Sequence, residues 1–198
     1  MIAGDTAIAE PFYIGTFEVT QAQYEAVMGD SPSYWGGSLS GQLPVEQVIW
    51  EDLTGETGFI ARLNRHLKSS GQTGFVVDIP SESEWEYTCR AGTDTAFNDG
   101  TAYTRSSGTP DLLDIANYDN REGKTVPVGR KSANAWGIFD MHGNIAEITR
   151  SAAGKPVLRG GSYRNSAGYL RSAARFQQAE GFSANKEWGF RIVLRPAR

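Results

Sequence analysis

The residue types that most often carry enzyme chemistry are scarce in this chain of 198 residues. It has one cysteine, Cys89, and two histidines, His66 and His142, which lie far apart in the sequence. One cysteine excludes a disulfide within the chain and a zinc site made of thiolates. Two distant histidines provide little material for a zinc or iron centre with histidine ligands.

Two carboxylates close in sequence, Glu84 and Glu86, could suggest a general acid and a general base. On a helix, residues at this spacing point to different faces, so the pair would not act on one substrate atom. Ser81 precedes Glu84 by three residues, which is the spacing of a capping box and gives Glu84 a structural role. Cys89 lies on the same predicted helix, where we expect a small buried residue.

These side chains are positioned by a pattern of strand followed by helix. The stretch FYIGTFEVTQAQYEAVMG predicts a strand and then a helix that begins with a capping box of Thr20 and Gln23 and ends at Gly29. The stretch VVDIPSESEWEYTCRAGT predicts a strand and then a short helix capped by Ser81 and ended by Gly92.

Between these two units, a short strand is predicted around Val45–Trp50. A second helix follows, with Phe59, Leu63 and Leu67 on one face and Gly71 as its end. Residues 93–135 are rich in Thr, Ser, Asp, Asn and Gly and predict long loops. Three tryptophans are expected in the core, namely Trp50, Trp85 and Trp136.

Short strands separated by turns are predicted in the last third of the chain. They cover Ile145–Thr149, Val157–Arg159, Arg171–Arg175 and Phe190–Leu194. No internal repeat or linker is visible, so residues 1–198 are predicted to form one domain. The expected class is α+β, with two or three helices around a small, mostly antiparallel sheet and much irregular coil.

Composition argues against several classes of function. The net charge of −4 and the lack of a basic cluster argue against a nucleic-acid partner. No apolar run approaches the length of a membrane span, and the first residues, MIAGDTAIAEPFYIG, do not resemble a signal peptide. A hydrophobic content of 39% with 23 glycines is typical of a soluble globular protein rich in loops. These features leave localisation open.

Six motifs, in this order, resemble those of one protein family. They are FEVTQAQYEAVMG, PVEQVIWEDL, IPSESEWEYTCRAG, VPVGRKSANAWGIFDMHGNIAE, RGGSY and GFRIV, and they extend from about Phe12 to Leu194. The series is similar to that of the formylglycine-generating-enzyme, or sulfatase-modifying-factor, family. The resemblance implies a variant of the C-type lectin fold, with a small mixed sheet, flanking helices and extensive ordered coil.

The catalytic residues of that family are not matched. Formylglycine-generating enzymes use two cysteines shortly after the GGS motif to bind copper and the substrate thiol. Here the matching stretch, GGSYRNSAGYLRSAAR, contains no cysteine. Related iron-dependent sulfoxide synthases take their histidine ligands largely from another domain, which nothing here supplies. The resemblance therefore implies a member that is not an enzyme and has no catalytic copper or iron.

The stretch DMHGNIAE, residues 140–147, matches a calcium-binding loop of the resembled family. The resemblance implies a structural Ca²⁺ bound by side-chain oxygens of Asp140 and Glu147 and by the backbone carbonyls of Gly143 and Ile145. Ca²⁺ takes about six to eight oxygen ligands and accepts carbonyls readily. The family usually has tryptophans on both sides of the Glu, where this chain has Ala and Ile. The alternative is a turn whose carboxylates accept hydrogen bonds from backbone amides.

The stretch 159–193 combines a regular frame with an irregular filling. The frame consists of RGGSY (159–163), RSAAR (171–175) and GFR (189–191), and the filling between these motifs mixes aromatic, small and polar residues. This arrangement resembles the variable proteins of diversity-generating retroelements, in which a reverse transcriptase that is inaccurate at adenines rewrites codons near the end of the gene. The resemblance implies a ligand-binding face for a macromolecular partner, expected to be a protein.

The residue types of the filling test this resemblance. Rewriting the first two bases of AAC codons gives Asn, Tyr, Ser, Ala, Gly, Phe, Arg and similar residues, but never Gln, Lys, Glu, Met or Trp. Six residues of the filling are thus fixed scaffold or count against the hypothesis, namely Gln177, Gln178, Glu180, Lys186, Glu187 and Trp188. The permitted types are also those of antibody loops. The predicted ligand-binding residues are Arg164, Asn165, Ser166, Gly168, Tyr169, Phe176, Phe182, Ser183, Ala184, Asn185 and Trp188.

The frame is expected to be structural. Gly160 and Gly161 would permit tight turns or a close approach of two backbones. The four arginines of the frame would donate several hydrogen bonds each to carbonyls of coil that lacks strand partners. They are Arg159, Arg171, Arg175 and Arg191.

Two alternatives to a variable binding face stay open. The filling could be ordinary coil in a non-catalytic accessory domain of a bacterial surface, kinase-linked or siderophore-pathway protein. The chain could also be an enzyme of this fold with unfamiliar chemistry, as in siderophore maturation, which would require a concave pocket with convergent polar groups. If the chain displays a binding face, we expect it at a cell surface or on a virus or phage particle.

Overall fold

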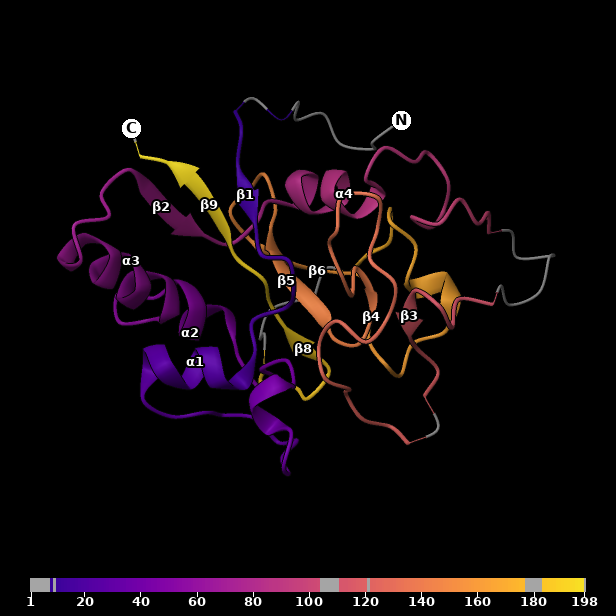
Figure 1. Cartoon of the computed structure of the whole chain (residues 1–198), viewed down its shortest axis with the longest axis horizontal. Coiled ribbons are helices and arrows are strands. Elements are labelled where there is room, and N and C mark those ends of the chain that lie inside the picture. The colour runs from indigo at the N-terminus through magenta and orange to yellow at the C-terminus, as the bar shows by residue number, and fades with distance from the viewer. Residues whose placement is uncertain (1–7, 9, 104–110, 121, 177–182, 198) are drawn as a thin grey trace.

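Helices dominate the first half of the chain and short strands the second (Figure 1). The structure, a computed structural model, describes residues 8, 10–103, 111–120, 122–176 and 183–197. Within these residues the α-helices are α1 (Gln21–Met28), α2 (Trp50–Thr54), α3 (Phe59–Ser69) and α4 (Glu82–Arg90). Two 3₁₀ helices lie in coil, η1 (Ser40–Gln42) and η2 (Ala167–Tyr169).

The described strands form three small sheets. One sheet has the antiparallel order β1 (Tyr13–Ile14), β9 (Val193–Pro196) and β2 (Phe75–Asp78). Another has the order β7 (Arg175–Phe176), β6 (Pro156–Arg159), β5 (Ala146–Arg150) and β8 (Trp188–Gly189), in which β8 alone runs parallel to its neighbour. The third is a parallel pair, β3 (Ala116–Asn117) and β4 (His142–Gly143). The predicted α+β class is confirmed.

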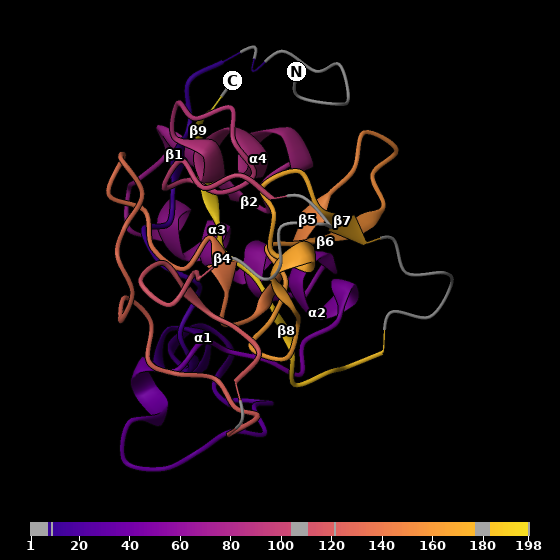
Figure 2. The same ribbon diagram turned by 90° about the vertical axis from the view of Figure 1, so that its right-hand side faces the viewer.

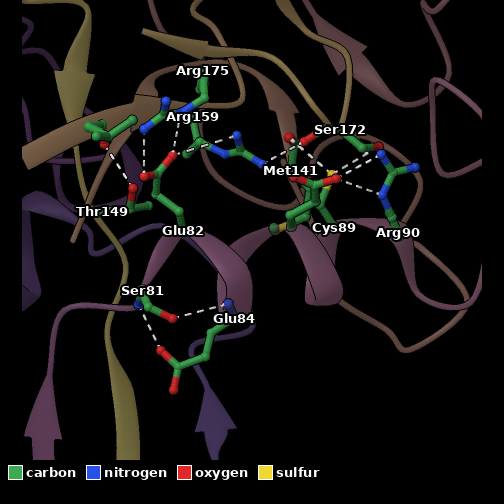
Figure 3. Close-up of polar contacts among 12 residues, drawn as sticks. Ser81, Glu82, Glu84, Cys89, Arg90, Met141, Thr149, Arg159, Ser172 and Arg175 are labelled. Carbon is green, nitrogen blue, oxygen red and sulfur yellow. Dashed lines mark hydrogen bonds and ion pairs between the residues drawn. The ribbon is translucent and has the colours of Figure 1, made fainter. Parts of the chain in front are cut away.

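Local sequence signals place the starts of α1 and α4 as predicted, but α4 ends at a left-handed Ala91 and not at the predicted Gly92. Thr20 and Gln23 form the capping box of α1, and Gly29 ends it with a φ of 92°. Ser81 and Glu84 form the same box at the start of α4 (Figure 3). In both cases the side chains satisfy amides that the first helical turn leaves without a partner.

The strand predicted around Val45–Trp50 is wrong. Trp50 instead begins α2, and Gln47 has a φ of 66°, a left-handed conformation that interrupts any extended run. Val45 and Val48 are fully buried. The apolar pattern of this stretch therefore reflects burial in irregular coil and not an extended strand.

Two strand predictions near the C-terminus also differ from the structure. Of the predicted strand Arg171–Arg175 only Arg175 belongs to a strand, β7. Of the predicted strand Phe190–Leu194 only Val193 and Leu194 do, at the start of β9. Backbone carbonyls between β8 and β9 still accept hydrogen bonds, from the amides of Gly15 and Val19. Coil contacts thus replace a continuous ladder here, which periodicity alone does not indicate.

The main core lies between helices α1 to α3 and the four-stranded sheet. Phe59 stacks on Tyr24 with ring centres 5.4 Å apart and meets Phe190 edge-on at 5.1 Å. Trp85 is fully buried, as predicted, whereas the prediction for Trp136 is wrong because its side chain is 46% exposed. No helix in the described part of the chain is long and apolar enough to cross a membrane.

Candidate functional site

The stretch 159–193 separates into a largely buried frame and a largely exposed filling. The motifs RGGSY and GFR are buried throughout, and RSAAR alternates between exposed and buried residues. Exposed residues of the filling are Arg164, Ser166, Tyr169, Ser183 and Ala184, and half-buried ones are Asn165, Gly168, Phe176 and Asn185. Figure 2 shows β6, β7 and the yellow segment before β8 in the right-hand part of the molecule. Phe182 lies outside the described residues.

Trp188 must be removed from the predicted binding residues. Its side chain is only 9% exposed and belongs to the main core. In β8 it pairs with Ala146 of β5, so the strand that carries it lies at the edge of the four-stranded sheet. A side chain buried in this way cannot contact a partner at the surface.

Side-chain contacts bring two parts of the filling together. Arg164 lies 3.4 Å from a carboxylate oxygen of Glu187, and the Ser162 hydroxyl donates to the other oxygen at 3.0 Å. The start and the end of the filling therefore lie side by side. Separately, Tyr169 and Phe176 pack with ring centres 5.3 Å apart.

The buried Arg159 joins the frame to α4 (Figure 3). It donates to the Glu86 carboxylate at 2.6 Å and to the Ser172 carbonyl at 2.9 Å. Its guanidinium also lies 5.3 Å from the ring centre of Trp85. Glu86 accepts from Arg90 as well, so it is part of a structural ion-pair network and not an acid–base pair with Glu84.

The other frame arginines differ in their acceptors. Arg171 donates to the Gly168 carbonyl at 2.8 Å, as predicted. For Arg175 the predicted carbonyl acceptor is wrong, since its described bonds go to both oxygens of the Glu82 carboxylate. Glu82 lies in the first turn of α4, where the positive end of the helix dipole stabilises a carboxylate.

The two glycines of the frame are required by backbone conformation. Gly160 and Gly161 have φ values of 82° and 69°, which side chains with a Cβ rarely adopt. A Cβ on Gly160 would also press against the Trp85 ring, at 3.0 Å. Of the two expectations, the close approach of two backbones is confirmed, since a Cβ on Gly160 would also lie 3.2 Å from the Met141 carbonyl oxygen.

Arg191 and Glu147 form an ion pair that is buried completely. Two guanidinium nitrogens donate to the two carboxylate oxygens at 2.6 Å, and the Trp85 indole donates to one of them at 2.7 Å. The side chains are 0% and 1% exposed. Arg191 also donates to the carbonyls of Gly15 and Phe139, so one residue connects the segment after β1, the loop before β4, and β5.

Further carboxyl groups surround this ion pair. Glu18 is buried and accepts from the side chain of Asn144 at 2.7 Å, and Asp140 accepts from the Gly129 amide at 2.6 Å. Burial raises the pKa of Glu18 well above its usual value, and the charges of Asp140 and Glu147 raise it further. Burial also raises the pKa of Asp140. Arg191 thus supplies the positive charge that offsets the repulsion among these buried carboxyl groups.

These contacts do not fit a calcium ion bound by Glu147. Both of its carboxylate oxygens already face the Arg191 guanidinium, which supplies the positive charge. Asp140 accepts from the Gly129 amide, as in the alternative of a turn that satisfies backbone amides, whereas the described hydrogen bonds of Glu147 come from the side chains of Arg191 and Trp85.

Cys89 and His142, 53 residues apart in sequence, meet in the interior. The thiol sulfur lies 3.7 Å from His142 Nε2 and 3.5 Å from the Ser172 hydroxyl. Such a pair could suggest an activated nucleophile. However, burial raises the pKa of the Cys89 thiol to about 12 and lowers the pKa of His142 to about 4. Both groups are therefore neutral at neutral pH, and the thiol is not activated.

The buried His142 predicts a loss of stability in mild acid. In the unfolded chain its pKa is 6.5, whereas burial lowers it to about 4 in the folded protein. Between these values the unfolded state binds more protons than the folded state. The contribution of His142 to the free energy of unfolding is therefore complete above pH 6.5 and is lost as the pH falls towards 4. This contribution is about 3 kcal/mol.

The measurement is urea unfolding at several pH values, for the wild type and for His142→Gln. Buried carboxyl groups with raised pKa contribute with the opposite sign in an overlapping range, so the difference between the two proteins isolates His142. The wild type should lose more stability than the variant between pH 6.5 and 4. Parallel curves would show that His142 does not titrate in this way.

A pocket of about 480 Å³ lies elsewhere, between β1 and α4. Its lining includes the rings of Phe12, Tyr87 and Trp136 and is mostly apolar. None of the predicted binding residues lines it. It does not provide the convergent polar groups that the enzymatic alternative requires.

Comparisons with known sequences agree with this architecture. Residues 3–196 match the family model of the sulfatase-modifying factor enzyme 1-like domain. Chaperone protein LppX of Paenibacillus barcinonensis is 31% identical over a match that covers 69% of this chain and 60% of LppX. The chain therefore spans less than two thirds of that relative.

Solved structures show the same fold. Treponema denticola variable protein 1 is 25% identical, with a TM-score of 0.76 over 93% of this chain and 84% of that protein. CarF is 25% identical, with a TM-score of 0.66 over 95% and 87%. PvdO from Pseudomonas aeruginosa, at 23% identity and a TM-score of 0.72 over 94% and 81%, is similar in fold alone. The fold is the C-type lectin-like fold of formylglycine-generating enzymes, and the chain belongs to the family of sulfatase-modifying factor enzyme 1-like domains.

Proposed function

We propose that this chain is a non-enzymatic binding protein, whose exposed filling forms a display face for a protein partner. We define the display face as Arg164, Asn165, Ser166, Gly168, Tyr169, Ser183, Ala184 and Asn185. The observation that carries the proposal is the division of one continuous stretch into buried frame and exposed filling. A chain that must vary its contacts while it keeps its fold needs this division.

The chemistry of the display face suits contact with a protein. Tyr169 is 50% exposed and rests on the ring of Phe176, so it can bury a large surface at little cost in conformational entropy. Arg164 has a half-exposed side chain and adds a planar group with several donors. The surrounding Ser, Asn and Gly residues can adapt their hydrogen bonds to different partners.

Buried side chains of the frame supply a fixed support for this face. Arg159 and Arg191 are fully buried and tie the frame to α4 and to the four-stranded sheet. Glu187, a residue type that adenine rewriting cannot produce, accepts from Ser162 and pairs with Arg164. The similarity to Treponema denticola variable protein 1 supports the proposal that a retroelement diversifies the filling.

The proposal predicts that the display face tolerates substitution and that the frame does not. The combined variant Arg164→Ser, Ser166→Tyr and Ser183→Tyr should keep its free energy of unfolding within roughly 1 kcal/mol of the wild type, because these side chains are exposed. Ser172→Tyr, which introduces the same residue type at a fully buried frame position, should lose about 3 kcal/mol or more.

Urea unfolding of the three proteins measures these changes. Equal losses in the display-face variant and in Ser172→Tyr would contradict a face built to vary. A separate experiment tests the proposal that the chain is not an enzyme. Copper-dependent oxidation of a cysteine peptide by the purified chain would contradict it.

A further inference from the structure

Next to the display face, two aromatic rings surround an ammonium group. The rings of Tyr34 and Trp35 lie 4.9 Å apart and are nearly perpendicular, at 88°. The Lys186 Nζ lies 4.6 Å from the centre of the Tyr34 ring and 5.3 Å from the centre of the Trp35 ring. A cation at such distances is attracted by the electron-rich ring faces. The two rings therefore form two walls around one ammonium.

A buried carboxylate lies behind these walls. Glu46 is 0% exposed, and one of its oxygens accepts from the Trp35 amide at 2.9 Å. The other oxygen, Oε2, has no hydrogen-bond partner among the described residues. Burying a carboxylate oxygen without a partner is costly, so Glu46 indicates a place that takes up a positively charged or hydrogen-bonding group.

The walls do not depend on Lys186 for their position. The Trp35 carbonyl accepts from the Gln21 side chain at 2.9 Å, and Ser33 accepts from the Glu46 amide at 3.2 Å. Neither bond involves the lysine. The Lys186 side chain is a flexible four-carbon stem, and it can leave while the rings and the carboxylate stay in place.

We propose that Tyr34, Trp35 and Glu46 form a binding site for an organic ammonium group of a ligand, which displaces Lys186 as the resident cation. The rings supply the cation–π faces and the carboxylate supplies the opposite charge. Burial raises the pKa of Glu46 and the charge of Lys186 lowers it, so a cation in the site favours the ionised carboxylate.

Two sources carry this chemistry. One is a lysine side chain on a protein partner, and this source rests on the proposed display function. Lys186 precedes Glu187 in the chain, and Glu187 pairs with Arg164 of the display face, so a partner on that face would lie near the site. The other is a free quaternary ammonium compound, which needs no hydrogen bonds and is held by ring faces alone. The test below distinguishes the two.

The experiment follows the indole N–H signal of Trp35 by NMR while ¹⁵N-labelled protein is titrated with tetramethylammonium or with Nα-acetyl-lysinamide. Lys186→Met removes the resident ammonium and keeps a side chain of similar length. This variant should bind at least one of the two cations about fivefold more tightly than the wild type, because no internal cation competes. Lys155→Met, which removes an exposed lysine elsewhere, should bind like the wild type.

A second variant tests the walls. Tyr34 is 62% exposed, so Tyr34→Leu in the Lys186→Met background should fold and should lose the saturable shift. Tighter binding of the lysinamide would identify a partner side chain as the source, and tighter binding of tetramethylammonium a free compound. Absence of a saturable shift in Lys186→Met, or a shift that Tyr34→Leu leaves unchanged, would overturn the proposal.

The titration uses no protein partner. A negative titration would therefore contradict the cation site and not the display face. Conversely, the display face can prove intolerant of substitution while the titration confirms the cation site.

Discussion

Arg191→Met is expected to lower the free energy of unfolding by about 3–5 kcal/mol, because it leaves Glu147 buried without its cation. The methionine fills much of the same volume, so the loss reports mainly the missing charge and hydrogen bonds. Arg191 donates to Glu147 and to the carbonyls of Gly15 and Phe139, and its side chain is 0% exposed. Glu18 and Asp140 lie in the same acidic cluster, where burial raises the pKa of each carboxyl and the charge of Arg191 lowers it.

The loss should be smaller in acid, because burial raises the pKa of Glu18 and of Asp140, and their protonation removes part of the negative charge around Arg191. Urea unfolding at neutral and at acid pH measures both effects. Lys124→Met is the matched control, since Lys124 pairs with Glu122 at 2.7 Å but both side chains are more than half exposed. Exposed pairs contribute little, so this variant should unfold like the wild type. A loss in Arg191→Met no larger than in the control would contradict a structural role for the buried pair.

Gly143→Ala is expected to cost about 3 kcal/mol or more, through two additive effects. Gly143 has a φ of 86°, which is strained for any residue with a Cβ. A Cβ at this position would also collide with the backbone carbonyl of Asn117, on the neighbouring strand β3. Because the obstacle is backbone and not the end of a flexible side chain, it cannot move aside easily.

Gly154→Ala separates the two effects. Gly154 has a similar φ of 74°, but nothing lies within 4 Å of the position that a Cβ would take there. This variant should lose about 1 kcal/mol, the cost of the left-handed conformation alone. Unfolding curves of both variants give the comparison. Equal losses would show that the contact between β3 and β4 is not close enough to require glycine.

Local signals in the sequence predicted local structure well. The capping boxes of Thr20 and Ser81 and the glycine after α1 are confirmed because each depends on residues within one helical turn. The family resemblance, which rests on ordered motifs, is confirmed by the family match and by the solved structures. It supplied the lectin-like topology, which periodicity could not provide for strands of two to five residues.

Contacts between distant residues were not predictable in the same way. Arg191 and Glu147 are 44 residues apart, and Cys89 and His142 are 53 apart, so their meeting depends on the tertiary fold. One signal was available for Trp188. It is a residue type that adenine rewriting cannot produce, which already indicated a fixed scaffold position, and the structure places it in the core.

The central claim, that the filling is built to vary, is tested most directly by sequencing the DNA just downstream of the gene in its native genome. The account predicts a near-copy of the stretch that encodes residues 159–193, with AAC or AAT at the codons of the display face and a reverse transcriptase gene nearby. Codons for Lys186, Glu187 and Trp188 should be the same in both copies. A downstream region without such a copy would contradict diversification by a retroelement.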